Sequence, residues 1–125
     1  MRDFKRIKAW QRALAIALHK RTRRFPREGY ARLKAQLTGA ADSIKDTIAE
    51  GAGAATNKEF ARFLDMSIKS ANETEGHLLT TRDLDLFSLG EWQKFTADSE
   101  DGLHVSKDGH RDAGRRMRRR RSPLS

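Results

Sequence analysis

The sequence predicts an all-α protein, an antiparallel up-down four-helix bundle that ends in a basic tail. Apolar side chains recur at steps of three and four residues along most of the chain, which is the spacing of one helix face. Strand-like alternation is absent, and the sequence holds a single valine, although valine is favoured in strands. The two prolines, Pro26 and Pro123, leave the long stretch between them open to several helices.

The first two predicted helices cover residues 4–25 and 28–49. Pro26 ends the first helix because its ring clashes with the preceding turn. The second helix ends where Gly51 and Gly53 follow its last periodic residue. The apolar stripe of the first helix consists of Ile7, Trp10, Leu14, Ala17, Leu18 and Phe25, and that of the second consists of Tyr30, Leu33, Leu37, Ala40, Ala41, Ile44 and Ile48.

The third and fourth predicted helices each open with a capping box, a Ser or Thr followed three residues later by Glu. Thr56 and Glu59 open the third helix, which covers residues 56–84, and Ser88 and Glu91 open the fourth. The apolar stripe of the third helix consists of Phe60, Phe63, Leu64, Ala71, Leu78 and Leu84, and that of the fourth begins with Leu89, Trp92 and Phe95.

The end of the chain is predicted to lose this pattern. Gly102 and Gly109 weaken the fourth helix, since glycine inside a helix costs about 1 kcal/mol relative to alanine, and its continuation towards Ala113 and Met117 depends on packing. The arginine-rich end of the chain, residues 115–125, has nothing to bury, so we expect it to be mobile and dispensable for folding. The predicted organisation is a four-helix bundle over residues 1–110 and a basic tail over residues 111–125.

Composition narrows the class of protein. The chain of 125 residues is long enough for one domain with tails. It has no cysteine, which excludes disulfides, thiolate metal sites and a cysteine nucleophile. The longest apolar stretch, residues 13–18, is far shorter than the ~20 residues of a membrane-spanning helix, and the N-terminus lacks the apolar core of a signal peptide. We therefore expect a cytoplasmic protein without membrane contact.

The net charge of +9 is unevenly distributed along the sequence. Residues 1–35 carry a net charge of +10, residues 36–101 carry −7 and residues 102–125 carry +6. Such a distribution attracts polyanions to the basic segments, while the acidic middle can meet basic surfaces, including those of other copies. The alternative is that the charges only keep a small helical protein in solution.

No catalytic or metal-binding pattern is present in the sequence. The four histidines form neither an i, i+4 pair nor the Glu-x-x-His pattern of helical metal sites. Glu73 and His77 are four residues apart and are interpreted as a solvated pair. Asp42, Asp46 and Glu50 are interpreted as a solvated or subunit-facing acidic stripe. We expect no metal, no cofactor and no enzymatic activity.

The predicted function is binding of RNA or DNA through phosphate groups. No helix-turn-helix or zinc-finger signature is present, so binding depends on charge and reads bases little. Trp10, Phe25 and Tyr30 have the spacing of core residues, which argues against base stacking. The predicted phosphate-binding residues are Arg12, Lys20, Arg23 and Arg24 near the first helix and Arg118, Arg119, Arg120 and Arg121 in the tail. The alternative is an oligomeric scaffold or protein-interaction module without nucleic-acid binding.

Several motifs resemble the bacterial four helix bundle protein family, whose members are also called intervening-sequence proteins because their genes are found inside insertions in large-subunit ribosomal RNA genes. The motifs are Phe4-Lys-Arg-Ile-Lys-Ala-Trp10, Phe25-Pro26, Ser43-Ile44, Ile48-Ala-Glu-Gly51, Lys58-Glu-Phe60 and Leu84-Asp-Leu86, in the family's order over residues 3–95. The sequence departs from the family pattern at Thr47, where Asn is common, and beyond Phe95, where Gly- and Arg-rich sequence replaces a regular fourth helix.

The resemblance implies a four-helix bundle assembled into a ring-like homopentamer. It also implies kinship with the accessory proteins of diversity-generating retroelements, which are similar bundles that bind nucleic acid and a reverse transcriptase. The expected partners are therefore other copies of this chain, RNA or DNA, and a nucleoprotein or reverse transcriptase. The residues themselves favour self-association because Trp92 and Phe95 lie in the weakly patterned fourth segment, where a neighbouring chain would cover them.

Overall fold

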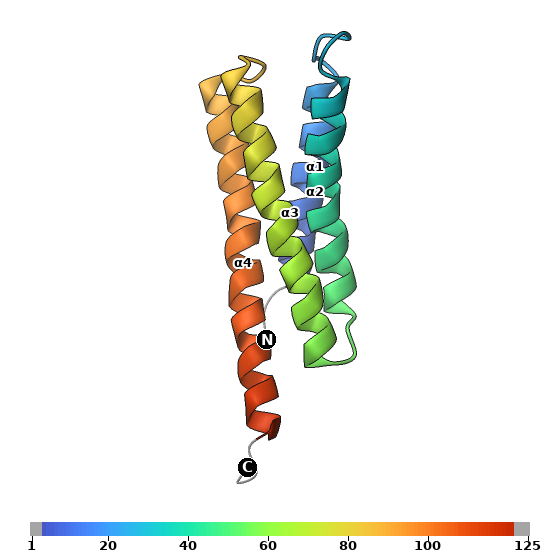
Figure 1. Cartoon of the computed structure of the whole chain (residues 1–125), viewed down its shortest axis with the longest axis vertical. Coiled ribbons are helices and arrows are strands. Elements are labelled where there is room, and N and C mark those ends of the chain that lie inside the picture. The colour runs from blue at the N-terminus through green and yellow to red at the C-terminus, as the bar shows by residue number, and fades with distance from the viewer. Residues whose placement is uncertain (1–3, 122–125) are drawn as a thin grey trace.

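The computed structural model describes residues 4–121 and, within them, the side chains of residues 9–51, 53–104 and 106–119. Four helices make up this part of the chain: α1 (Phe4–Thr22), α2 (Ala31–Ala52), α3 (Asn57–Asp83) and α4 (Leu89–Arg121). They form two antiparallel hairpins, α1–α2 and α3–α4, which are joined mainly by packing of α2 against α3 (Figure 1). The prediction of an all-α four-helix bundle is confirmed.

The turns of the two hairpins lie at one end of the long axis, and the α2–α3 connection and the end of α4 lie at the other (Figure 1). Helix α1 ends at Thr22, slightly before the predicted end at Phe25, and two short backbone hydrogen bonds continue the turn. Arg24 N donates to Arg21 O at 3.2 Å, and Phe25 N donates to Thr22 O at 3.1 Å. Gly29, with φ of +90°, then reverses the chain in a conformation that glycine adopts without strain.

Helix α2 continues past its predicted end. The sequence predicts that Gly51 breaks the helix, but α2 runs to Ala52 and Gly53 follows as its C-cap. Packing explains the difference, because Gly51 is buried against α3. A Cβ atom at this position would lie 3.1 Å from Phe63 Cβ, so glycine here permits a close approach of α2 and α3.

The predicted starts of α3 and α4 are confirmed by their capping hydrogen bonds. Thr56 Oγ1 accepts a hydrogen bond from Glu59 N at 3.1 Å. At α4 the capping box is complete: Glu91 N donates to Ser88 Oγ at 3.1 Å, and Ser88 N donates to Glu91 Oε1 at 3.0 Å.

Helix α4 is longer than the sequence predicts. It continues through both internal glycines to Arg121 as one helix of 33 residues. Packing rescues the weak segment: Ser106 Oγ lies 3.0 Å from Ser67 Oγ of α3, and Ala113 is 1% exposed. The helix therefore crosses the predicted domain boundary at residue 110 without a break. The expected mobility of the basic tail stays a prediction, and residues 122–125 lie outside the described residues.

The apolar core lies towards the end with the two hairpin turns. Leu14 and Leu18 of α1 meet Leu37 of α2, Leu78 of α3 and Phe95 of α4 there. Farther along the bundle a second, smaller apolar cluster of Ile44, Ile48 and Ala71 is mixed with short polar side chains. Besides the Ser67–Ser106 contact, the hydroxyls of Ser43 and Ser70 lie 2.8 Å apart between α2 and α3. Short side chains of this kind let the helices approach closely.

Several aromatic and aliphatic residues are not where the sequence predicts. Trp10 and Leu84, both expected in the core, are each 47% exposed. Phe95 is buried within this chain, and Trp92 is half-buried with the Arg82 guanidinium 4.5 Å from its ring centroid. The expectation that Trp92 and Phe95 need a neighbouring chain is therefore wrong. None of the helices in the described part of the chain is long and apolar enough to cross a membrane.

Candidate nucleic-acid interface

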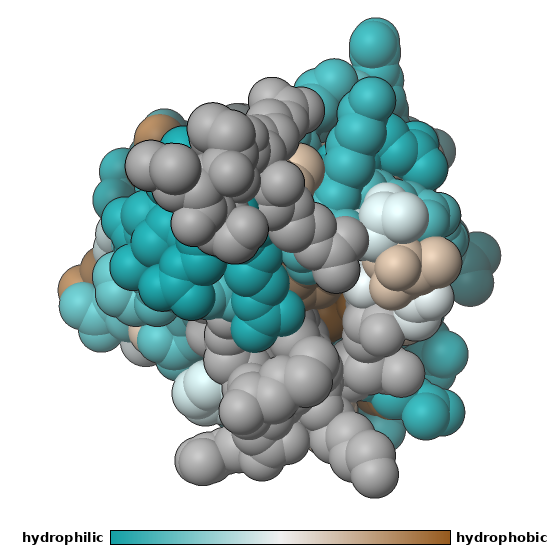
Figure 2. All heavy atoms as spheres, turned by 90° about the horizontal axis from the view of Figure 1, so that it is seen from below, coloured by the Kyte–Doolittle hydropathy of each residue, from teal (hydrophilic) through white to brown (hydrophobic). Residues whose placement is uncertain are grey.

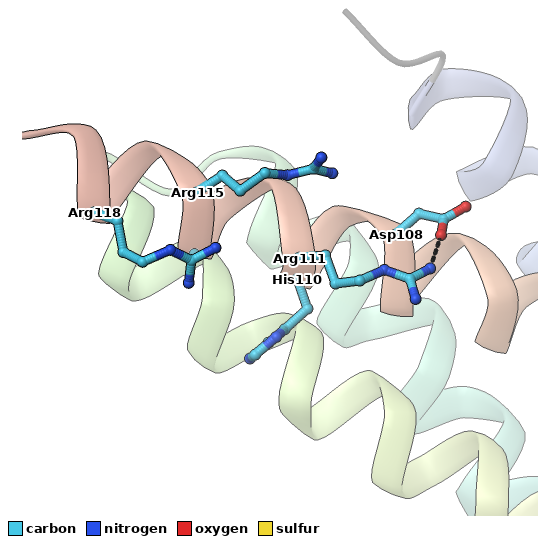
Figure 3. A pocket seen from close by; sticks show the side chains of 6 residues that line it. Asp108, His110, Arg111, Arg115 and Arg118 are labelled. Atoms are coloured by element: carbon cyan, nitrogen blue, oxygen red, sulfur yellow. Dashed lines mark hydrogen bonds and ion pairs between the residues drawn. The ribbon is translucent and has the colours of Figure 1, made fainter.

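Three arginines on the last part of α4 form a cationic surface. Arg111, Arg115 and Arg118, which we call the arginine face, follow one another at steps of four and three residues and so lie on one side of the helix. They line a shallow hollow together with Asp108, His110 and Gly114. Figure 3 shows the three side chains extending along α4 towards its start.

The charge of the arginine face is largely uncompensated. Arg111 pairs with Asp108 one turn earlier. Arg115 and Arg118 have no carboxylate partner among the described residues. Arg118 folds back along the helix, where its Nη1 atom would lie 3.5 Å from a Cβ added to Gly114. Two exposed guanidinium groups, three residues apart on α4, are thus available to bind an anion.

Contacts with α3 hold this part of α4 in place. His110 Nε2 lies 2.9 Å from Asp65 Oδ1, so an ion pair or hydrogen bond joins α4 to α3. Ala113 is buried beside it, and Met117 is half-buried against the start of α3. Viewed from this end of the bundle, the described surface is mostly hydrophilic (Figure 2). The arginine face is therefore presented on a supported helix.

The predicted residues of the first helix lie elsewhere. Arg12, Lys20, Arg23 and Arg24 are all exposed, but they are spread from the middle of α1 to the α1–α2 turn. Because that turn and the end of α4 lie at opposite ends of the bundle, the structure does not bring the two predicted groups together (Figure 1). Arg118 and Arg119 are exposed as predicted, and the side chains of Arg120 and Arg121 lie outside the described residues.

The sequence reasoning missed Arg111 and Arg115. Their spacing relative to Arg118 was a usable signal, since steps of four and three place side chains on one helix face. That signal requires a continuous helix, and the sequence alone left the continuation of the fourth helix open. Arg21 shows the opposite case: it belongs to the basic segment over residues 1–35, but its guanidinium pairs with Glu91 and donates to Leu86 O at 2.9 Å, so it is structural.

Two residues of the acidic stripe, Asp42 and Asp46, lie beside basic side chains. Asp42 Oδ2 lies 2.8 Å from His19 Nε2, and Lys45 lies 3.8 Å from Asp42 and 3.6 Å from Asp46. In the part of the chain whose side chains are described, no group of three or more His, Asp or Glu side chains is arranged to hold a metal ion. Burial raises the pKa of the Glu75 carboxyl, and the nearby Glu100 carboxylate raises it further.

Fold and surface together define a class of protein: a small helical bundle made of two hairpins, with a cationic face on its last helix. The chain belongs to the 23S rRNA-intervening sequence protein family, whose model matches residues 5–103. The resemblance noted in the motifs is thereby confirmed. The arginine face lies beyond the matched segment.

A solved structure has the same fold. It is a protein of unknown function from the S23 ribosomal protein family of Bacteroides thetaiotaomicron VPI-5482, with a TM-score of 0.75 and 20% sequence identity. The superposition covers 83% of this chain and 97% of that chain. At this identity the likeness concerns the fold alone. A comparison with curated proteins gives no match.

Proposed function

We propose that this chain binds RNA through its phosphate groups, without catalysis, and that it does so in the cytoplasm. The observation that carries the proposal is the arginine face, where Arg115 and Arg118 lack carboxylate partners on a supported helix. The description of the family, which refers to an intervening sequence of 23S rRNA, favours RNA over DNA as the ligand.

The chemistry of the arginine face fits a phosphate backbone. A guanidinium group presents several N–H donors in a planar fork that matches two phosphate oxygens, and it stays charged at every physiological pH. Each phosphate contact releases condensed counterions, so affinity falls as salt rises. Contacts of this kind position a strand without reading its bases. We therefore expect strongly salt-dependent binding with little sequence preference.

Charge reversal at the arginine face tests the proposal. The variant Arg115→Glu/Arg118→Glu removes two contacts, so the log–log salt slope for single-stranded RNA should become shallower by about 1.4, at ~0.7 per phosphate. The matched control, Lys69→Glu/Lys94→Glu, makes the same charge change at exposed positions away from the arginine face. Fluorescence anisotropy with a labelled RNA of about 20 nucleotides, between about 50 and 200 mM salt, measures both.

The outcomes of this experiment separate cleanly. The proposal requires that the arginine-face variant bind more weakly than the control variant while both keep the helical circular dichroism of the parent. If the two variants lose the same RNA affinity, the loss is caused by the change in net charge and not by the arginine face. If the parent protein shows no binding at about 50 mM salt, the chain does not bind RNA.

A second proposal, self-association, is supported by the outward face of α1. Trp10 and Ile16 are 47% and 46% exposed, and at 3.6 residues per turn Ala13 and Ala17 lie between their directions around the helix. Exposed apolar residues grouped in this way mark a contact surface for another protein. We propose that a second copy of the chain covers this face, and the homopentamer implied by the resemblance is the arrangement we favour.

A further inference from the structure

A second cationic hollow lies at the corner between α1 and α2, far from the arginine face. Its cationic lining comes from Arg23, Arg27 and Lys34. The remaining lining residues are mostly apolar or aromatic: Thr22, Phe25, Pro26, Tyr30 and Ala31. We call this site the corner hollow. The sequence reasoning included Arg23 but neither Arg27 nor Lys34, because the three come together only when the chain turns.

The cations of the corner hollow are not neutralised within the chain. None of Arg23, Arg27 and Lys34 pairs with a carboxylate among the described residues. Over residues 22–34 the sequence has five Arg or Lys residues and one acidic residue, Glu28. At the same end of the bundle Arg21 forms an ion pair with Glu91. A basic residue that stabilises the fold here therefore has a carboxylate partner, in contrast to the three cations of the corner hollow.

The corner that carries these cations is fixed by packing. Phe25 is 8% exposed and its ring centroid lies 5.7 Å from that of Phe87. Thr22 is buried, and its hydroxyl donates to Leu18 O at 2.8 Å. Tyr30 packs against the same core. The backbone that carries the basic side chains is therefore held in place, which lowers the entropy cost of gathering them around an anion.

We propose that the corner hollow is a second phosphate-binding site for the RNA strand, in addition to the arginine face. This inference rests on the proposed function and extends it to the other end of the molecule. The corner hollow lies beside the start of α4, because Arg21 contacts Glu91 there. At about 1.5 Å per residue along α4, Arg115 is roughly 36 Å away from Glu91. One chain then contacts RNA at two well-separated places.

The test compares two variants that change the charge at the same end of the bundle equally. Arg23→Glu/Arg27→Glu, the lining variant, alters the lining of the hollow, whereas Arg32→Glu/Lys94→Glu, which we call the rim variant, alters two exposed residues that do not line it. Both are measured by anisotropy with the same labelled RNA over the same salt range. The lining variant should have a slope shallower by about 1.4 on single-stranded RNA and the rim variant a slope close to that of the parent. Thermal melting establishes that both variants fold.

Inorganic phosphate separates a strand-binding site from a general anion site. If millimolar phosphate removes from the parent only the part of RNA binding that the lining variant loses, the hollow binds free phosphate. That result would overturn the proposal that the hollow binds RNA. Equal effects of the lining and rim variants would also overturn it, because only the overall field would then matter. If Arg115→Glu/Arg118→Glu weakens binding while the lining variant matches the parent, the arginine face binds RNA and the corner hollow does not. If the parent fails to bind, both proposals fall.

Discussion

At the scale of single residues, Arg21 joins the two hairpins. Its guanidinium on α1 pairs with Glu91 at the start of α4 and donates to Leu86 O. The same group lies 5.2 Å from the ring centroid of Phe87. The side-chain hydrogen bond from Arg21, followed by the hydrogen bond from the Ser88 backbone, lowers the pKa of Glu91 to about 2. One charged pair thus closes the corner that α1 and α4 share.

This pKa predicts how the stability of the fold depends on pH. Because the Glu91 carboxyl has a lower pKa when folded than its ordinary 4.5, the unfolded chain binds the proton more tightly. The stabilising contribution is therefore complete above about pH 5 and is lost as the pH falls towards 2. Since the side chain is about a third exposed, we expect about 1 kcal/mol, or about 4 °C in melting temperature.

The variant Glu91→Gln measures this contribution. It should melt below the parent at pH 7, and the gap should close as the pH approaches 2. Asp83→Asn is the matched control, since among the described residues Asp83, which is exposed, pairs with its sequence neighbour Arg82 at 3.2 Å. The interpretation is wrong if Asp83→Asn has the same effect, or if the gap for Glu91→Gln does not change with pH.

At the scale of the elements, α4 depends on its contacts with α1 and α3. Gly102 is the closest point, because a Cβ atom there would lie 1.9 Å from Nε2 of Gln11. Gln11 is itself 2% exposed, so its side chain has little room to move. This explains why a residue that weakens an isolated helix is required inside this one.

Alanine substitution at two helical glycines tests this explanation. Gly102→Ala should destabilise the fold by roughly 1–3 kcal/mol, as overpacking does. Gly76→Ala, in open space on α3, should stabilise it by up to about 1 kcal/mol. Denaturant titration measures both. Adding Gln11→Ala to Gly102→Ala should recover part of the loss. If both glycine variants are stabilising, the contact between Gln11 and Gly102 does not constrain α4.

Truncation tests how far α4 belongs to the bundle. Removing residues 118–125 should leave the melting temperature nearly unchanged, because the described residues of that segment are exposed. Removing residues 110–125 also deletes buried Ala113 and the contact of His110 with Asp65, so the melting temperature should fall by several degrees. Equal melting temperatures for the two truncations would mean that the end of α4 does not dock on α3.

At the scale of the whole molecule, the two cationic sites and the outer face of α1 are separated. The end of α4, which carries the arginine face, and the α1–α2 turn, which carries the corner hollow, lie at opposite ends of the long axis (Figure 1). The exposed Trp10 and Ile16 belong to neither site. Binding to RNA and binding to another copy of the chain therefore do not compete for the same residues. A multimer built through α1 would carry several copies of each cationic site, which raises avidity for a long RNA.

Charged substitutions on α1 test self-association. The parent protein should scatter light as a species heavier than its 14.2 kDa monomer, and Trp10→Glu/Ile16→Glu should shift it towards that monomer. Met66→Glu/Leu89→Glu is the control, since these apolar residues are also exposed but lie on other helices. A parent that is monomeric at micromolar concentration would contradict the proposal. So would equal dissociation in both variants.

The sequence by itself determined the class of fold and most helix boundaries, because these depend on local physics. The three- and four-residue spacing of apolar side chains predicted four helices, and the Thr56 and Ser88 caps fixed the starts of α3 and α4. The lack of cysteine also excludes disulfides, thiolate metal sites and a cysteine nucleophile. Helix periodicity and helix capping depend on residues that are close together in the sequence.

Only the tertiary structure decided the length of α4 and which residues form the two cationic sites. The cost of Gly102 is offset by packing against Gln11, which lies far away in the sequence, so local helix preference predicted too short a helix. That longer helix aligned Arg111 with Arg118, and the α1–α2 turn brought Arg27 near Lys34. Trp10 has the spacing of a core residue but lies outside, because periodicity shows which residues share a face and only packing shows which faces meet.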